Sequence, residues 1–569
     1  MSPGKDRFAL VVSFVNNGAA ATTEGGAIAS VRPTAATPGA TAPLTSPSTA
    51  PSAHPLLVPV LVFFGMVIAM MSSLGAPLVP TIAQHLHVSS DTAQWSLTAS
   101  LLASAVCTPV FGRLADGRFC RLTMLLVLAG TMLGTILAAV ATDFAVLLVG
   151  RTLMGAAMGL LPMAITVSRA HLPAERARSA IALLSVTSAA GVGLGYPLTG
   201  LVTGWFGYRA AFWVGGVVVL IALVAVALVV PHNTSVKHTP LDTPGAGLLG
   251  AALLALLLAI SQAPRWGWAD TRVLGLFAAT VVLLAAWVAW ENHCAQPLVD
   301  LRLLRHPWVF TADIAALSAG VGLYLMLSLT IRFVETPSST GYGHNASVLV
   351  AGLMILPLSA ASVIASRLAA RFAARFGPAS AIPWGGLVFT GGLLLLLKEH
   401  QQVWAVLVAT AAAGVGLACT FAAMPGMILR AVPAGETGSA MSINQLLRSI
   451  GYSVGSALSA VALSAHTPAG AALPRWSGYE LGFGLAIVMW LVTAAIAFAV
   501  PRWTKPSTAP LSVTTPAAVP SPAAPVDATG PHDLRARELV EQRELADEQE
   551  LIEEMEESGE TGAAGLPCR

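Results

Sequence analysis

Ionisable side chains inside apolar segments are the first chemical feature of this sequence. Arg151, Asp313 and Arg448 each lie within a run of about 20 mostly apolar residues. A charge in the middle of a bilayer costs about 2.5–3.5 kcal/mol on the lowest scales, so such residues are candidates for function. Arginine does not deprotonate, and proton transfer therefore requires an acid or a histidine. Asp313 is the only carboxylate clearly inside an apolar segment, and we predict that it is the main proton-coupling residue.

Two carboxylates compete for this role, and each has a structural alternative. Asp313 stands near the start of its segment, where it could instead pair with Arg305 or His306. Glu335, three residues after Arg332 at the other end of the segment, is the reserve candidate for proton coupling. Its alternative is an ion pair at the membrane interface.

A polar stripe marks a later apolar segment. Asn444, Arg448 and Tyr452 are spaced four residues apart, which places them on one face of a helix. A polar stripe on a membrane helix is expected to face a wet cavity or another helix. We predict that these three residues and Arg151 line the substrate cavity. For Arg448 the alternative is that its long side chain reaches out to the membrane surface.

The segments that carry these residues are typical of membrane helices. The chain has 569 residues, of which 55% are hydrophobic and 10% charged, against about 25% charged in an ordinary soluble domain. The mean hydropathy is +0.73. This composition predicts an all-α polytopic membrane protein. The fourteen predicted spans are 56–79, 92–112, 122–142, 144–167, 179–202, 208–230, 244–263, 273–290, 308–333, 347–370, 380–397, 402–424, 438–464 and 480–500.

Both ends of the chain have a different composition. Residues 1–54 are rich in Ala, Thr, Pro and Ser and are predicted to be disordered. Residues 504–569 comprise a similar linker and an acidic tail, whose stretch 533–560 carries a net charge of −9. The loops predicted to be cytoplasmic hold thirteen basic residues and the opposite loops six. This bias predicts a multi-pass protein of the cell (inner or plasma) membrane with both termini in the cytoplasm.

An internal repeat organises the spans. The charged loop "FGRLADGRFCR" after the second span is echoed by "ASRLAARFAARFG" after the tenth, with Ala370 in the place of Asp116. If the seventh and eighth spans are an insertion, the chain is a parallel repeat of six plus six helices, as in many secondary transporters. The predicted organisation is 56–230 for the first half, 244–290 for two extra spans and 308–500 for the second half.

Three motifs resemble the signatures of the major facilitator superfamily, and the fourteen spans resemble its drug:proton antiporter branch. "GRLADGRFCR" is similar to the loop signature in Gly112, Leu114, Asp116 and Arg121. "RTLMGAAMG" resembles the fourth-span signature in Arg151 and Gly155, with Met154 in place of the common Gln. "GVGLGYPLTG" resembles the fifth-span antiporter signature in Pro197 and Gly200, with Tyr196 where Gly is usual.

The resemblance implies roles for these motifs. In the family, the loop's acid and arginines hold the cytoplasmic helix ends together in one conformation, so Gly112, Arg113, Asp116 and Arg121 would form a gate. The alternative is that the arginines only set orientation. In the fifth span, Gly191, Gly195, Pro197 and Gly200 would form a small-residue seam against the opposite half. The family's usual first-span acid is missing, because its position is occupied by Met71.

These features predict a proton-coupled exporter of amphipathic, drug-like organic compounds that works by alternating access. A lipid or metabolite exporter and a proton-coupled importer of the same fold are the alternatives. The expected partners are the organic substrate, protons and the bilayer, with no nucleic acid, and the expected state is a monomer. No cofactor or metal is expected, because the five cysteines show no ligand spacing. A membrane-embedded transferase is a distant alternative, since only His85, His87 and Asp91 form a cluster, and no enzyme is predicted.

Overall fold

The computed structural model describes residues 55–74, 78–231, 241–294, 297–468, 471 and 473–503, and within these ranges every regular element is a helix. The predicted end segments 1–54 and 504–569 lie outside the described residues. The first half contains α2 (Leu57–Ser73), α3 (Val79–His85), α4 (Ser90–Ala115), α5 (Cys120–Val140), α6 (Phe144–Ala156), α7 (Leu161–His171), α8 (Ala174–Phe206) and α9 (Tyr208–Val229). Next come α10 (Thr243–Trp266), α11 (Thr271–His293) and the short α12 (Leu301–Leu304). The second half contains α13 (Pro307–Glu335), α14 (Val348–Phe376), α15 (Ala381–Lys398), α16 (Val403–Ala431), α17 (Thr437–Ala465) and α18 (Trp476–Trp503).

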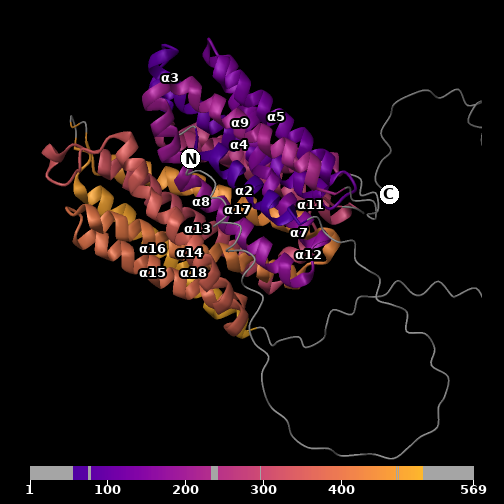
Figure 1. Cartoon of the computed structure of the whole chain (residues 1–569). Helices are drawn as coiled ribbons and strands as arrows, with labels where there is room; N and C mark the ends of the chain where they lie inside the picture. The colour runs from indigo at the N-terminus through magenta and orange to yellow at the C-terminus, as the bar shows by residue number, and fades with distance from the viewer. Residues whose placement is uncertain are drawn as a thin grey trace, which may run out of the picture. The chain divides into compact units, whose positions relative to one another are not determined.

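Each of the fourteen predicted spans coincides with helical structure (Figure 1). Among the described residues, twelve helices are long and apolar enough to cross a membrane, which confirms a multi-pass architecture. The remaining two positions are occupied by α2, whose apolar part Leu57–Met71 is shorter, and by the 33-residue α8. The all-helical membrane fold predicted from composition is therefore confirmed.

Two spans differ from the single helices that we expected. The first predicted span ends early, because α2 stops at Ser73 and α3 begins at Val79. The fourth is split into α6 and α7 by the 3₁₀ turn Ala157–Leu160. Pro162 has no N–H to donate to the carbonyl four residues before it, which favours such a break. Gly159 in this turn packs close to α4, where an added Cβ would lie 2.8 Å from the Phe111 ring.

The two six-helix halves repeat the same packing. In the first half α2 packs on α8, α4 on α6 and α5 on α9, and in the second half α13 packs on α17, α14 on α16 and α15 on α18. The contacts between the halves are also paired, since α4 packs on α17 and α14 packs on α8. This correspondence is what a parallel repeat predicts.

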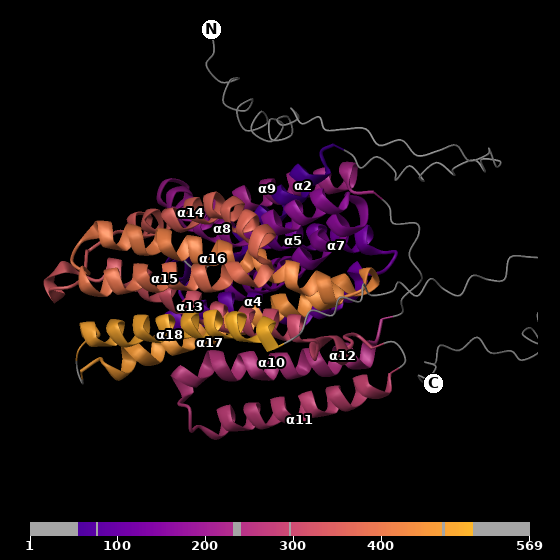
Figure 2. The same cartoon turned by 90° about the horizontal axis from the view of Figure 1, so that it is seen from below.

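The two extra helices form a hairpin along one side of the bundle (Figure 2). α10 packs on both α4 and α17, with Leu249 and Leu253 in a cluster that includes Ala105 and Leu446. At the open end of the hairpin, the Trp290 indole N–H donates to the Asp242 carboxylate at 3.1 Å and so connects the end of α11 to the start of α10. The hairpin therefore covers the place where α4 and α17 meet.

The crossing of α4 and α17 leaves no room for side chains. A Cβ added to Gly112 would overlap Ser442 and lie 2.7 Å from the Gly438 carbonyl oxygen. A Cβ added to Gly438 would lie 2.8 Å from the Ala115 Cβ. The two backbones are therefore in direct contact, as small residues allow in membrane helices.

Gly112→Ala should destabilise this crossing by about 1–3 kcal/mol, because the added methyl group overpacks it. Gly130→Ala is the matched control, since nothing lies within 4 Å of its added Cβ in α5 and removing a helical glycine stabilises by about 0.5–1 kcal/mol. Thermal unfolding of the purified variants in detergent should show a lower midpoint for Gly112→Ala and an equal or higher one for Gly130→Ala. Equal midpoints would contradict the tight crossing.

Candidate functional site

A carboxylate of the first half caps a helix of the second half. Asp116 directly follows α4 and is 4% exposed. Its Oδ1 accepts a hydrogen bond from the Gly438 N–H at 2.7 Å, and its Oδ2 accepts from the Ser439 N–H at 2.9 Å and the Ser439 Oγ at 3.0 Å. These donors lie in the first turn of α17, where N–H groups have no partner within the helix and a negative charge is favoured. We call this contact the Asp116 cap.

Burial and neighbouring groups change the pKa of Asp116, and the loop arginines differ in what they contact. Burial raises the pKa of Asp116 to about 6, because the loss of solvation outweighs the opposing effects of its hydrogen bonds to Gly438 and Ser439 and of the nearby Arg113. Arg121, also predicted in the gate, contacts its own half instead, and its Nη2 donates to the Ala227 carbonyl of α9 at 2.5 Å. Of the four predicted gate residues, Gly112 and Asp116 contact the other half directly, and Arg113 interacts electrostatically with Glu436 of that half.

A second contact between the halves is made by Arg169, which the sequence did not distinguish from the other basic loop residues. This arginine at the end of α7 donates from Nη1 to the Thr437 Oγ1 at 2.5 Å and from Nη2 to the Val432 carbonyl at 3.1 Å. Cations are favourable at helix C-termini, and Val432 follows the end of α16. No local pattern distinguishes Arg169 from its basic neighbours, so its partners could only be found from the fold.

The small-residue face of α8 packs in two directions. A Cβ at Gly191 would lie 3.0 Å from the Met66 carbonyl oxygen of α2, whereas at Gly200 it would lie 3.4 Å from the Leu349 Cα of α14. The expectation that this whole face meets the opposite half is therefore wrong for Gly191, because α2 of the same half occupies that position. Gly195 and Pro197 are buried within α8.

Arg151 is buried within the first half. It lies on α6, is 1% exposed, and donates from Nε to the Ser96 carbonyl of α4 at 3.3 Å. The Arg151 carbonyl in turn accepts from the Ser100 hydroxyl at 2.8 Å. The structure therefore places Arg151 between α4 and α6 and apart from the residues of the polar stripe.

The predicted proton-coupling residue faces α17. Asp313 is 4% exposed, and its Oδ1 accepts from the Asn444 Nδ2 at 3.0 Å. Further along the same face of α13, a Cβ at Gly320 would lie 2.8 Å from the Arg448 carbonyl oxygen. The register thus pairs Asp313 with Asn444 rather than with the basic residues before α13. Glu335 is the last residue of α13 and lies far along the helix from this pair.

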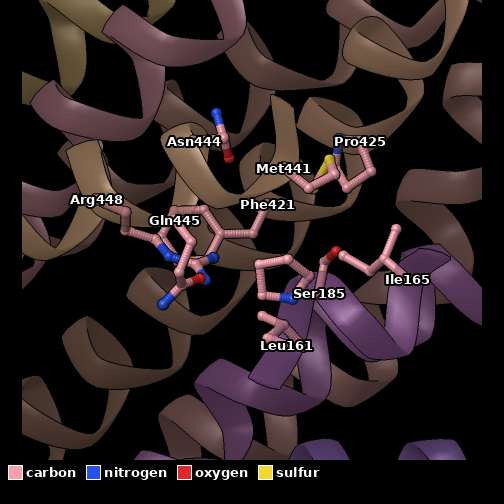
Figure 3. Close-up of a pocket in the computed structure, with 10 residues that line it drawn as sticks. Leu161, Ile165, Ser185, Phe421, Pro425, Met441, Asn444, Gln445 and Arg448 are labelled. Atoms are coloured by element: carbon pink, nitrogen blue, oxygen red, sulfur yellow. The ribbon is translucent and has the colours of Figure 1, made fainter. Parts of the chain in front are cut away.

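A small cavity lies between the two halves (Figure 3). Its polar lining residues are Ser185 of α8 and Asn444, Gln445 and Arg448 of α17, and its apolar lining residues are Leu161, Pro162, Ile165, Phe421, Pro425 and Met441. Asn444 and Arg448 line this cavity, whereas the Tyr452 ring contacts the Tyr324 ring of α13 in a tilted arrangement with centroids 5.9 Å apart. Asn444 therefore contacts both Asp313 and the cavity.

Two further sequence observations have structural counterparts. Met71, at the position of the family's usual first-span acid, is buried and packs beside Gly215 of α9. His85 contacts the Thr81 carbonyl at 3.1 Å and the edge of the Tyr208 ring. Among the described residues there is no group of three or more histidines, cysteines, aspartates or glutamates that could hold a metal ion.

Known proteins that are similar to this chain are membrane transporters, which agrees with its fold of two helical halves. Residues 61–356 and 309–543 match the family model of the Major Facilitator Superfamily. The chain is 28% identical over 412 residues to the tetracenomycin C resistance and export protein of Streptomyces glaucescens, covering 70% of this chain and 74% of that protein. It is 29% identical over 391 residues to the multidrug resistance protein Stp of Mycobacterium tuberculosis, covering 68% and 72%.

A lipid transporter and a solved structure are also similar. The triacylglyceride transporter of Mycolicibacterium smegmatis is 27% identical over 391 residues, covering 63% of this chain and 66% of that protein. The crystal structure of the human organic anion transporter MFSD10 (TETRAN) superposes with a TM-score of 0.52 at 17% identity, covering 78% of this chain and 99% of that one. The last comparison supports the fold. Together the fold and the relatives are those of membrane transporters and not of enzymes.

Asp116→Asn should reduce transport at least about tenfold while membrane insertion is retained, because hydrogen bonds to a charged acceptor contribute about 1.5–3 kcal/mol. The asparagine amide would also direct a donor toward backbone N–H groups. Asp143→Asn is the control, since Asp143 caps α6 of its own half. Transport rates at equal expression test this, and an unchanged rate for Asp116→Asn would leave the loop only a role in orientation.

The Asp116 cap should also respond to pH in a defined direction. Because the pKa of buried Asp116 is raised to about 6, the capped conformation binds a proton more tightly than an open one with a solvated carboxyl. The capped conformation should therefore gain population as pH falls from about 8 to 5. Electron-spin distances between labels at exposed positions 179 and 371 should show this shift, and Asp116→Asn should abolish it.

Proposed function

Because the chain belongs to the major facilitator superfamily, we propose that it exports amphipathic organic compounds in exchange for protons by alternating access. The export and drug-resistance proteins among its relatives support the direction and the substrate class. Both termini would then lie in the cytoplasm of a cell-membrane protein, and the Asp116 cap would close the cytoplasmic end. The monomer expected from the sequence is part of the same proposal.

Alternating access is supported by two helices that carry both the contacts between the halves and part of the cavity lining. We call the contacts made by Asp116 and Arg169 the seam. α7 contributes Arg169 to the seam and Ile165 to the cavity, while α17 contributes Ser439 to the seam and Met441 to the cavity. Separation of these helix ends would open the cavity at the end that carries Asp116. Release of the Asp116 cap and of Arg169 is therefore the proposed inward-opening step.

Asp313 is the proposed proton carrier. Its partner Asn444 also lines the cavity, so a change in the charge of Asp313 would be transmitted to the cavity through one hydrogen bond. A protonated carboxyl would accept less strongly from Asn444 and would free the amide to contact substrate. Exchange requires that the proton and the substrate favour different states of the protein, and a shared hydrogen bond is one way to link them.

A lipid exporter is the second candidate. The relative named as a triacylglyceride transporter is almost as similar as the drug exporters, and it supports an apolar substrate. The cavity is compatible with both, because most of its lining is apolar. The distinction depends on whether substrates partition from the aqueous phase or from the membrane.

Cells that express the chain should accumulate less of an amphipathic dye than control cells, and a protonophore should abolish the difference. Export that persists when the proton gradient is collapsed would contradict proton coupling. Failure to export dyes, combined with movement of labelled triacylglycerol between vesicle leaflets, would favour the lipid exporter.

Asp313→Asn should abolish proton-driven efflux while substrate still binds, because the amide keeps the shape of the carboxyl but cannot carry a proton. Everted vesicles with a lumenal pH dye should show substrate-dependent proton movement for the parent chain and none for the variant. Glu335→Gln is the matched carboxylate control on the same helix and should retain proton movement. A parental signal from Asp313→Asn would show that this carboxylate is structural.

A further inference from the structure

One charged group lines the cavity, and no carboxylate of the described residues pairs with it. Arg448 is the only charged residue among the ten that line the cavity, and it is 5% exposed. Its Nη2 donates to the Gln445 Oε1, and its guanidinium lies 4.6 Å above the Phe421 ring. Its Nε is buried without a hydrogen-bond partner among the described residues. Gln445 and Phe421 are neutral, and Tyr452, which also interacts electrostatically with Arg448, is a phenol rather than a carboxylate.

The carboxylate on the facing helix does not neutralise this charge. Asp313 accepts from Asn444, one turn before Arg448, and the face of α13 that follows it presents Gly320 to the Arg448 backbone. A buried cation without an anion is costly by several kcal/mol, which is why buried charges are normally paired. An anion that entered the cavity would offset this cost.

We propose that the transported compounds are organic anions, in which one carboxylate or acidic phenolate binds Arg448 and an apolar or aromatic body occupies the rest of the cavity. This inference rests on the proposed export function and specifies its substrate class. Guanidinium groups bind carboxylates through two parallel hydrogen bonds, and the unpaired Nε is available for one of them. Phe421 supports the guanidinium from one side and so fixes its plane for an incoming acid.

The rest of the lining fits such a molecule. Ser185, Asn444 and Gln445 supply the neutral polar groups, whereas Leu161, Ile165 and Met441 supply an apolar wall. None of the described residues that line the cavity is a carboxylate that would attract a lipophilic cation. The same Arg448 that attracts an anion repels a cation, so the site discriminates by charge.

Three probes with the same apolar body test the inference: 1-pyrenebutyrate, the neutral 1-pyrenebutanol and the cationic 1-pyrenebutylamine. Fluorescence titration of the purified full chain should show at least about tenfold tighter binding of the anion than of the alcohol, and the weakest binding for the cation. Arg448→Gln should bind anion and alcohol equally, while Arg448→Lys should keep part of the preference, because the charge remains but the two-bond geometry is lost. Arg209→Gln, an exposed arginine outside the cavity, should behave like the parent.

A stability measurement separates substrate binding from a structural role. If Arg448 serves only the fold, Arg448→Gln lowers the thermal midpoint, and pyrenebutyrate does not raise the midpoint of the parent. If Arg448 awaits an anion, Arg448→Gln retains or raises the midpoint, and pyrenebutyrate stabilises the parent but not the variant.

The outcomes for export are distinguishable as well. Equal export of all three probes would overturn the anion inference and leave the exporter proposal intact. Selective binding of pyrenebutyrate without any export would overturn the exporter proposal and support the anion site.

Discussion

The backbone contact between α4 and α17 is the constraint on which the rest of the structure depends. Glycine at 112 and 438 lets the two helices meet without side chains between them, and only at that separation can the Asp116 oxygens reach the Gly438 and Ser439 N–H groups. One acid thus satisfies donors that α17 cannot satisfy itself. Because the bonds run between the halves, they tie together two bodies that have to separate in any alternating-access cycle.

The two symmetric seams of the repeat are not equivalent. The α4–α17 seam has a buried carboxylate and glycines with no room for a Cβ, and Arg169 of α7 contacts α17 beside it. At the α8–α14 seam, a Cβ added to Gly200 would make only ordinary van der Waals contact with Leu349. The sequence carries Ala370 where a second acid would stand. Charged hydrogen bonds require a specific geometry of donor and acceptor, whereas apolar contacts persist when one helix slides along another. This asymmetry fits the proposed cycle, in which the halves part at the end that carries Asp116.

The polar face of α17 connects these features. Its first turn receives Asp116, its second presents Met441 and Asn444 to the cavity, and Arg448 follows one turn later. The extra hairpin packs against the opposite side of the same helix through Ile443 and Leu446. A single helix thus carries the seam, the proposed proton partner and the proposed anion site, so that movement of α17 would change all three together.

The sequence by itself determined the all-helical membrane architecture, the positions of the spans and the residues worth attention, because apolar length and misplaced charge are local properties that the bilayer makes costly or favourable. It also placed Asn444 and Arg448 on one face, since helical spacing is fixed. Only the tertiary structure decided which groups pair. Arg169 joins the seam, Arg121 turns back to its own half, Gly191 meets α2 and Arg151 lies away from the cavity. These outcomes depend on which helices become neighbours, and that is set by the packing of the whole bundle rather than by any segment's own pattern.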